Sequence, residues 1–285
     1  QTTGNAFWVF KTDQFGNIEW NYFYDDIGED RVEEVRQTTD GGFMVVGFTD
    51  SYGAGETDAL LIKLDSFGNS SWEEVLGGVY GEIATSIEQT ADGGYVLTGR
   101  TWNYALNNYA DVWLLKTDSE GNFEWERMFG GENYEIGWCV RQTMDSGFVI
   151  AGYTSSFGEG MEDAWLIKTD GEGNIEWDKT FGGADSDLVY DLIEADTGIF
   201  TMAGVISSAG AGLEDAWLIS VIADLTQIEL TYPFGGAILS FPSTFSWAAH
   251  GGSNNVFAVD FALSPSGPIY STWENLHLYI PEDSW

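Results

Sequence analysis

Four aspartates hold one position in a repeating sequence, and their spacing of 52 or 53 residues makes them the first candidates for chemistry. They are Asp58, Asp111, Asp163 and Asp215. Carboxylate and loop carbonyl oxygens are suitable ligands for calcium, so calcium is a candidate cofactor and no cofactor is certain. Each aspartate also stands directly before an apolar segment, where its simpler role is to cap a turn. No D-x-D-x-D-G calcium loop accompanies them.

Paired carboxylates are the second chemistry that the sequence offers. The chain has 46 aspartates and glutamates, and two carboxylates about 5 to 9 Å apart would meet the requirement for glycoside hydrolysis. Because acidic residues are so numerous, the sequence does not identify a particular pair, and it assigns no catalytic residue. The two histidines, His250 and His277, support neither a histidine metal cluster nor a Ser-His-Asp site. The single cysteine, Cys139, lies in the apolar run GWCV and is predicted to be a buried thiol.

One connection between repeats departs from the others in a way that favours ligand binding. The segment RTWNYALNNYADVW carries aromatic and amide side chains where the other repeats carry small Ser and Gly residues. Aromatic faces and amide groups are what sugar rings require, through stacking and hydrogen bonds. The alternative is a loop that packs on its neighbour or on a partner subunit. The candidate ligand-binding residues are Trp102, Asn103, Tyr104, Asn107, Asn108 and Tyr109.

These candidates are set in a unit of about 52 residues that runs four times through the chain and begins a fifth. A lysine marks the copies at Lys11, Lys63, Lys116 and Lys168, and Ser220 takes the same place in the fifth. Such a constant period predicts one structural unit for each copy.

The first half of each unit predicts a β-hairpin. An apolar strand runs into T-D-x-x-G-N, and a second strand ends at a tryptophan. The glycine of the turn is expected to take a positive φ, and the tryptophans are expected to pack between neighbouring units. The lysine and the aspartate two residues later are expected to form local ion pairs. The glycines are Gly16, Gly68, Gly121 and Gly173, and the tryptophans are Trp20, Trp72, Trp125 and Trp177.

The second half predicts another hairpin, with the pattern Q-T-x-D-G-G followed by an apolar strand that ends in glycine. Four short strands in about 50 residues, with no helical period, are typical of a β-propeller blade. A β-solenoid is the alternative. Four blades are favoured, and a five-bladed ring is also open. The small residues at Gly47, Gly99, Gly152 and Gly204 are expected to lie in the innermost strand of each blade.

The combined pattern D-x-W-L-x-K-T-D-x-x-G-N-x-x-W, F-G-G and Q-T-x-D-G-G-Y resembles the β-propeller repeats of secreted and cell-surface proteins of archaea and bacteria. The resemblance covers about residues 6 to 222. It implies an extracellular or cell-surface propeller, often joined to immunoglobulin-like or fibronectin-like modules.

The period disappears near Thr226, and the tail alternates short apolar strands with Pro and Gly. We therefore expect a repeat domain over 1–225 and an immunoglobulin-like or fibronectin-like β module over 226–285. About 60 residues are too few for a full sandwich. The module is either incomplete or completed by a strand from elsewhere, which would allow self-assembly.

The formal net charge of −36 limits the partners. Nucleic acids and anionic lipids bind through clustered Lys and Arg, so neither is expected. No run approaches 18 consecutive apolar residues, so no membrane insertion is expected. The first residue, Gln1, fits a processed secreted product or an excised fragment.

Two functions from different classes follow from these patterns. The first is a non-catalytic extracellular or cell-surface propeller that acts as a binding or structural module, with a protein or a glycan as its partner. The second is a carbohydrate-active enzyme that uses paired carboxylates.

Overall fold

The computed structural model describes residues 6–24, 28–102, 109–209 and 214–222, together with the backbone of two short strands at 239–240 and 262–263. The regular elements in these residues are all β-strands, which confirms the all-β fold class. No helix long and apolar enough to cross a membrane occurs in this part of the chain. Apart from β18 (Leu239–Ser240) and β19 (Ala262–Leu263), which pair with each other, the expected module at 226–285 lies outside the described residues.

Three complete sheets have four antiparallel strands each, in chain order. The first comprises β3 (Asp30–Gln37), β4 (Phe43–Thr49), β5 (Asp58–Leu64) and β6 (Ser70–Leu76). The second comprises β7 (Glu82–Gln89), β8 (Tyr95–Trp102), β9 (Ala110–Thr117) and β10 (Phe123–Phe129). The third comprises β11 (Glu135–Gln142), β12 (Phe148–Thr154), β13 (Asp163–Thr169) and β14 (Ile175–Phe181).

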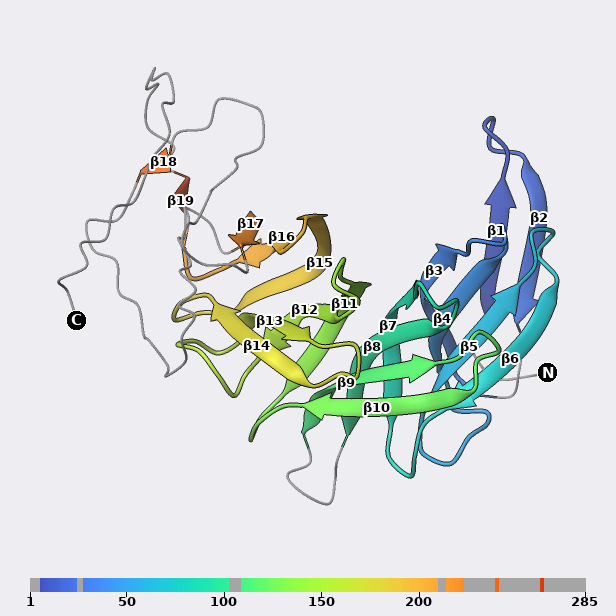
Figure 1. The fold of residues 1–285 in the computed structure, drawn as a ribbon, viewed down its shortest axis with the longest axis horizontal. Coiled ribbons are helices and arrows are strands. Elements are labelled where there is room, and N and C mark those ends of the chain that lie inside the picture. The colour runs from blue at the N-terminus through green and yellow to red at the C-terminus, as the bar shows by residue number, and fades with distance from the viewer. Residues whose placement is uncertain are drawn as a thin grey trace.

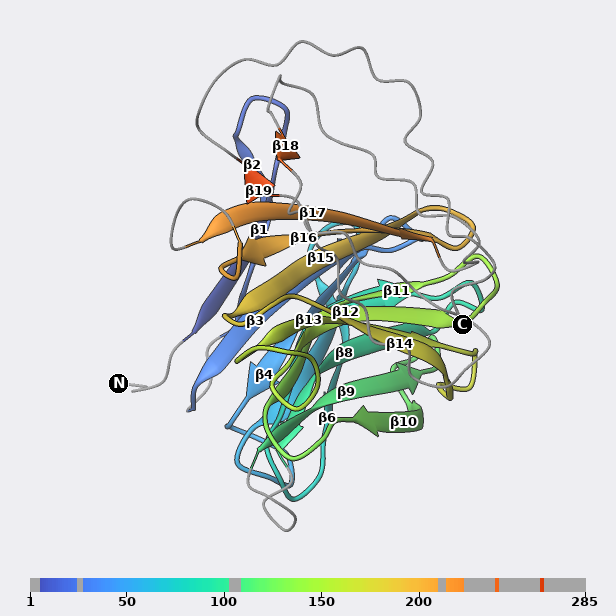
Figure 2. The same ribbon diagram turned by 90° about the vertical axis from the view of Figure 1, so that its left-hand side faces the viewer.

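Two smaller sheets lie at the ends of this series. The hairpin of β1 (Phe7–Thr12) and β2 (Ile18–Tyr24) precedes it, and a three-stranded sheet of β15 (Asp187–Asp196), β16 (Ile199–Ile206) and β17 (Asp215–Ile222) follows it. Figure 1 shows the sheets in chain order from one end of the series to the other, and Figure 2 shows them with the end formed by β15, β16 and β17 towards the viewer. The sheets are blade-like units of the propeller type. Within the described residues they form an open series, since β1 pairs only with β2 and β17 only with β16.

Each sheet combines the second hairpin of one sequence repeat with the first hairpin of the next. The strand that opens the sheet therefore carries the sequence before Q-T-x-D-G-G, and the K-T-D strand is third. The turn between the third and fourth strands is built by aspartate: Asp65 Oδ1 accepts hydrogen bonds from Phe67 N at 2.8 Å and Asn69 N at 2.9 Å. Gly68 takes a φ of 81° in this turn, which a residue with a side chain rarely adopts.

The glycines expected in the innermost strand lie instead in the second strand of each sheet, so that prediction is wrong. A Cβ on Gly99 would lie 1.9 Å from the carbonyl oxygen of Ile83 in the first strand. The cause is a β-bulge in the first strand, which brings its backbone against the glycine. The same contact recurs at Gly47, Gly152 and Gly204.

Tryptophans near the start of each fourth strand pack across to the next sheet. The ring of Trp125 lies 5.8 Å from that of Phe148 in β12, and a Cβ on Gly173 would lie 2.7 Å from the same indole. Equivalent ring pairs are Trp20–Phe43, Trp72–Tyr95 and Trp177–Phe200. The buried apolar clusters likewise draw their residues from adjacent sheets, so the core lies between the sheets.

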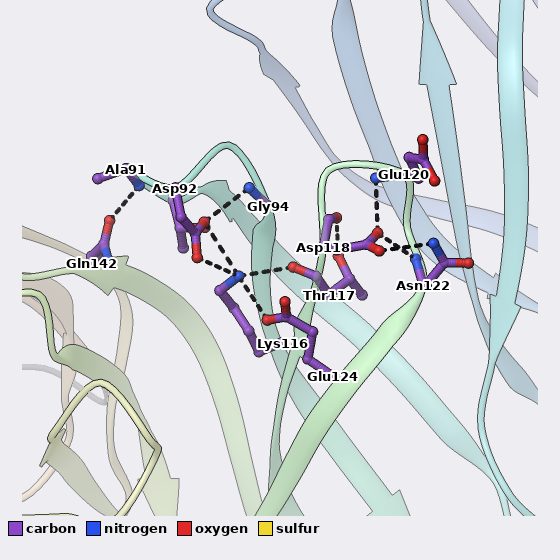
Figure 3. A network of polar contacts seen from close by, with 11 residues as sticks. Ala91, Asp92, Gly94, Lys116, Thr117, Asp118, Glu120, Asn122, Glu124 and Gln142 are labelled. Atoms are coloured by element: carbon purple, nitrogen blue, oxygen red, sulfur yellow. Dashed lines mark hydrogen bonds and ion pairs between the residues drawn. The ribbon is translucent and has the colours of Figure 1, made fainter.

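Three of the repeated lysines, Lys63, Lys116 and Lys168, are buried and reach back to the turn between the first and second strands. Lys11 is exposed and pairs with Glu19 in its own hairpin. Lys116 is 4% exposed, and its Nζ lies 3.1 Å from Asp92 Oδ2 and 3.1 Å from Glu124 Oε2 (Figure 3). The expected partner Asp118 instead accepts from Asn122 and Glu120 within its own turn (Figure 3). The prediction of ion pairs between residues two apart is therefore wrong. Lys63 and Lys168 make the same cross-strand pairs, with Asp40 and Asp145.

The turn after each first strand also fastens neighbouring sheets together. Ala91 N donates to Gln142 Oε1 in the next sheet at 2.8 Å (Figure 3). Thr39 N donates to Gln89 Oε1 and Met144 N donates to Glu194 Oε2, both at 2.8 Å. The Gln of the Q-T-x-D-G-G pattern, and the Glu that replaces it in the last sheet, thus hold the first strands of successive sheets side by side.

Candidate functional site

The first strands of successive sheets contact one another, β3 with β7, β7 with β11 and β11 with β15. Each has a bulge at the same place, where one residue has no partner in the second strand. The bulge removes that residue from the regular alternation of the strand and re-aims its side chain. The bulged residues are Glu33, Thr85, Trp138 and Tyr190.

The bulged residues and the residues that follow them line a single cleft, which we call the first-strand cleft. Its volume is about 290 Å³. The following residues are Glu34, Ser86, Cys139 and Asp191, so that all four first strands contribute. A space of this size is at the lower end of the range for small-molecule sites.

Two aromatic rings form one part of the cleft wall. Trp138 and Tyr190 meet edge to face, with a centroid distance of 6.0 Å and an interplanar angle of 65°. Tyr190 is 46% exposed, and Trp138 is half-buried. The Trp138 indole Nε1 is buried and has no hydrogen-bond partner among the described residues. It is a donor only, so it can be satisfied by an acceptor on a bound molecule.

Three carboxylates supply the charge, and each is paired with an arginine. Glu34 Oε1 lies 2.7 Å from Arg36 Nε, and its Oε2 accepts from Ile87 N of the next sheet at 2.8 Å. Asp191 Oδ1 accepts from Arg141 Nη2 at 2.9 Å.

Glu33 completes this set, since its Oε1 lies 2.9 Å from Arg31 Nε. Such contacts restrict the carboxylates to few orientations.

The expected buried thiol also lies in this cleft. Cys139 is 2% exposed, and its Sγ donates to Asp191 Oδ1 at 3.1 Å. Burial raises the pKa of Cys139 to about 12, although Arg141 opposes the shift. The thiol is therefore protonated at neutral pH and is no nucleophile.

The aromatic loop chosen from the sequence is described only at its two ends. Trp102 ends β8, where its ring lies 4.7 Å from the Arg100 guanidinium carbon. Tyr109 is 38% exposed and meets the ring of Tyr134 at 5.0 Å. Both therefore contact neighbouring side chains. Asn103, Tyr104, Asn107 and Asn108 lie outside the described residues.

The four recurring aspartates stand at or near the start of the third strands. Asp58 and Asp163 are buried, while Asp111 and Asp215 are half-buried. Each of the first three faces a carboxylate that opens the first strand of the next sheet, namely Glu82, Glu135 or Asp187. No group of three or more metal-ligating side chains occurs in the described part of the chain.

Sequence reasoning missed the first-strand cleft, although a signal was present. In V-E-E-V-R-Q, A-T-S-I-E-Q and G-W-C-V-R-Q, the apolar and Gln positions agree while the second and third letters change completely. Positions that vary between otherwise similar repeats are not needed for the structure that the repeats share. The bulges at these positions bring their side chains together in one cleft.

Comparisons with known proteins add little to this site. No family model matches the chain, and no curated protein matches it. Among solved structures, one similar chain is a candidate exo-beta-1,3-galactanase from Bifidobacterium bifidum s17. The two share 12% identity with a TM-score of 0.43, over 78% of this chain and 82% of the other. This likeness is too distant to support an argument about fold or activity.

Proposed function

We propose that this chain is a non-catalytic binding module of a secreted or cell-surface assembly, and that its first-strand cleft holds a glycan. The observation that carries the proposal is the content of that cleft. An aromatic pair, an unsatisfied indole donor and three oriented carboxylates lie on four adjacent strands. Aromatic faces stack on the apolar faces of sugars, and carboxylates accept hydrogen bonds from hydroxyl groups.

The cleft is built for recognition because its polar groups are held in place before a ligand arrives. Glu34 and Asp191 are fixed by arginines and by backbone N–H groups of the first strands. A ligand that meets groups already oriented loses less of its binding free energy to ordering the site. Rigid first strands, fastened through Gln89 and Gln142, serve the same end.

The same contacts argue against the alternative of glycoside hydrolysis. Hydrolysis needs one carboxyl group that carries a proton and a second that is ionised. Glu33, Glu34 and Asp191 each face an arginine. Each of these carboxylates is therefore already engaged by the protein, whereas a general acid or a nucleophile must be free to meet the substrate.

The net charge of the chain limits the classes of glycan that it can bind. A protein with a formal net charge of −36 repels uronic acids and sulfated sugars. Neutral sugars and amino sugars are the compatible classes. The resemblance of the repeats to those of secreted and cell-surface propellers supports the same setting, in which glycans are abundant.

The test is a binding screen of the full chain on immobilised glycans at 0.15 M salt, followed by calorimetry with the best ligand. We expect saturable binding to a neutral or amino glycan and recovery of that glycan unchanged. Shortened products after incubation would instead favour the hydrolase. Failure to bind any neutral or amino glycan would contradict the proposed ligand class.

A further inference from the structure

At three junctions between successive sheets, two carboxylates that are buried or half-buried face each other. We call them the junction pairs, and they are Asp58–Glu82, Asp111–Glu135 and Asp163–Asp187. In each pair the aspartate lies at the start of a third strand and the partner opens the first strand of the next sheet. Glu82 is 4% exposed, while Glu135 and Asp187 are fully buried.

The first glycine of the F-G-G pattern, which reads L-G-G at the first junction, shows how closely the carboxylates approach. A Cβ on Gly77 would lie 2.2 Å from Asp58 Oδ1 and 2.6 Å from Glu82 Oε2. At Gly130 the corresponding distances are 1.8 Å to Asp111 Oδ1 and 2.8 Å to Glu135 Oε2. Both oxygens of a pair therefore border the same small space.

The third junction repeats this geometry. A Cβ on Gly182 would lie 2.2 Å from Asp163 Oδ1 and 2.7 Å from Asp187 Oδ2. The glycine keeps the space free of a side chain at all three junctions.

The other oxygens of the first junction pair are satisfied by the protein. Asp58 Oδ2 accepts from Gly55 N at 3.2 Å, and Glu82 Oε1 accepts from Thr101 Oγ1 at 2.8 Å. Glu82 Oε2 accepts from Gly78 N at 2.8 Å. In contrast, Asp58 Oδ1 is buried with no hydrogen-bond partner among the described residues, and it points at the space that Glu82 shares.

The charge of each junction pair is also uncompensated. None of the ion pairs that the described lysines and arginines form includes a member of a junction pair. Burial raises the pKa of Asp58, Asp111 and Asp163, and the facing carboxylate adds to the shift at Asp111 and Asp163. Buried charges of one sign are costly unless a counter-charge or a proton neutralises them.

We propose that each junction pair binds one hard divalent cation of the calcium class between the aspartate Oδ1 and the facing carboxylate. Two carboxylates and one divalent cation are electrically neutral, and oxygen is the ligand that calcium prefers. The cation bridges two successive sheets, so it strengthens the contact between them. This role is independent of the first-strand cleft.

The start of β3, which precedes all three junction pairs, offers a matched control within the chain. Asp30 opens β3 as Glu82 opens β7, and it is 3% exposed. The position equivalent to Asp58 is occupied by Ala6, so Asp30 faces no aspartate there. Asp30 alone supplies one of the two proposed carboxylate ligands, and its charge neutralises only half of that of a divalent cation.

The test is calcium binding by calorimetry to the full chain, previously freed of metal with a chelator, in 0.15 M KCl with 2 mM MgCl2 present. We expect saturable calcium binding, and a stoichiometry that falls by about one in Asp163→Asn and by about one in Asp111→Asn. Asp30→Asn is expected to leave the stoichiometry unchanged. Wild-type chain should also unfold at a higher temperature in calcium than in chelator.

Three results would overturn the proposal. One is the absence of saturable calcium binding by the wild-type chain. Another is equal loss in Asp30→Asn and Asp163→Asn, which indicates diffuse binding to an acidic surface. The third is a melting temperature that responds to pH but not to calcium, which indicates that the carboxylates share a proton. Because the wild-type measurements decide on their own, the test remains decisive if a variant fails to fold.

Discussion

Trp138 and Tyr190 hold equivalent bulge positions in successive first strands, and their rings meet edge to face at a centroid distance of 6.0 Å. The same positions in the two preceding sheets are Glu33 and Thr85. One structural device, repeated four times, thus presents four different side chains in one cleft. The repeats share one backbone framework, and the bulge positions are where their side chains differ.

Gly99→Ala should destabilise the fold, because the added methyl group would lie 1.9 Å from Ile83 O. We expect a loss of about 3 kcal/mol in the free energy of unfolding, as for an overpacked core position. Urea unfolding followed by tryptophan fluorescence measures it. Gly78→Ala is the control, since nothing lies within 4 Å of a Cβ there. Equal stability of the two variants would refute the close approach at the bulge.

Trp125→Ala should loosen the contact between the second and third sheets. The indole contacts Phe148 and the turn at Gly173, and its loss leaves a cavity between sheets. We expect a cost of about 3 kcal/mol, at the low end for a large aromatic because the residue is only half-buried. Trp8→Ala serves as the control, since Trp8 is 52% exposed. A cost for Trp125→Ala no greater than that of the control would show that the indole does not join the sheets.

The lysine-bound turns predict a loss of stability in acid. Burial opposes ionisation of Asp145, but hydrogen bonds from Thr143, Gly147 and Lys168 outweigh it and lower the pKa of Asp145 to about 2. An unfolded aspartate has a pKa of about 3.9. A carboxylate whose pKa is lower in the folded chain stabilises it above about pH 4, and this contribution disappears as the pH falls towards 2.

Lys168→Met should therefore reduce stability at pH 7 by about 1 kcal/mol, since the carboxylate partners are largely solvated. It should also flatten the decrease in stability between about pH 4 and 2. Thermal unfolding at several pH values compares the two chains. Parallel curves for wild type and variant would contradict the assigned ion pair.

Cys139 should be inert to thiol reagents in the folded chain. Burial raises the pKa of this thiol to about 12, so almost no thiolate is present at pH 8. A chromogenic disulfide reagent should react fully in denaturant and negligibly without it. Rapid reaction of the native chain would show that the thiol is accessible from the cleft.

The sequence was sufficient for the fold class because turn residues at a fixed period determine hairpins. Asp65 accepts hydrogen bonds from the backbone of its turn and Gly68 takes a positive φ, as is usual for these residue types. The sequence did not reveal which strand lies innermost. Gly47 and Gly99 are glycines because the backbone of the neighbouring strand lies against them, and this requirement does not depend on their distance from a propeller axis. Lys116 was given the wrong partner because Asp92, 24 residues earlier, approaches it only once the strands pair. The cleft was missed because a bulge changes the direction in which the Trp138 side chain points. Unlike a hairpin turn, this bulge is not marked by a characteristic turn residue in the sequence.

The measurement that bears most directly on the central claim is glycan binding by Trp138→Ala, made beside Phe67→Ala as a control. Phe67 is 76% exposed and lies in the turn between β5 and β6, away from the cleft residues. Removal of a stacking aromatic typically costs a binding site about 2 kcal/mol or more, which is a factor of roughly 30 in Kd. We expect calorimetry to show at least that loss for Trp138→Ala, with an unchanged Kd for Phe67→Ala and similar melting temperatures for both. Full affinity in Trp138→Ala would contradict the assignment of the first-strand cleft as the binding site.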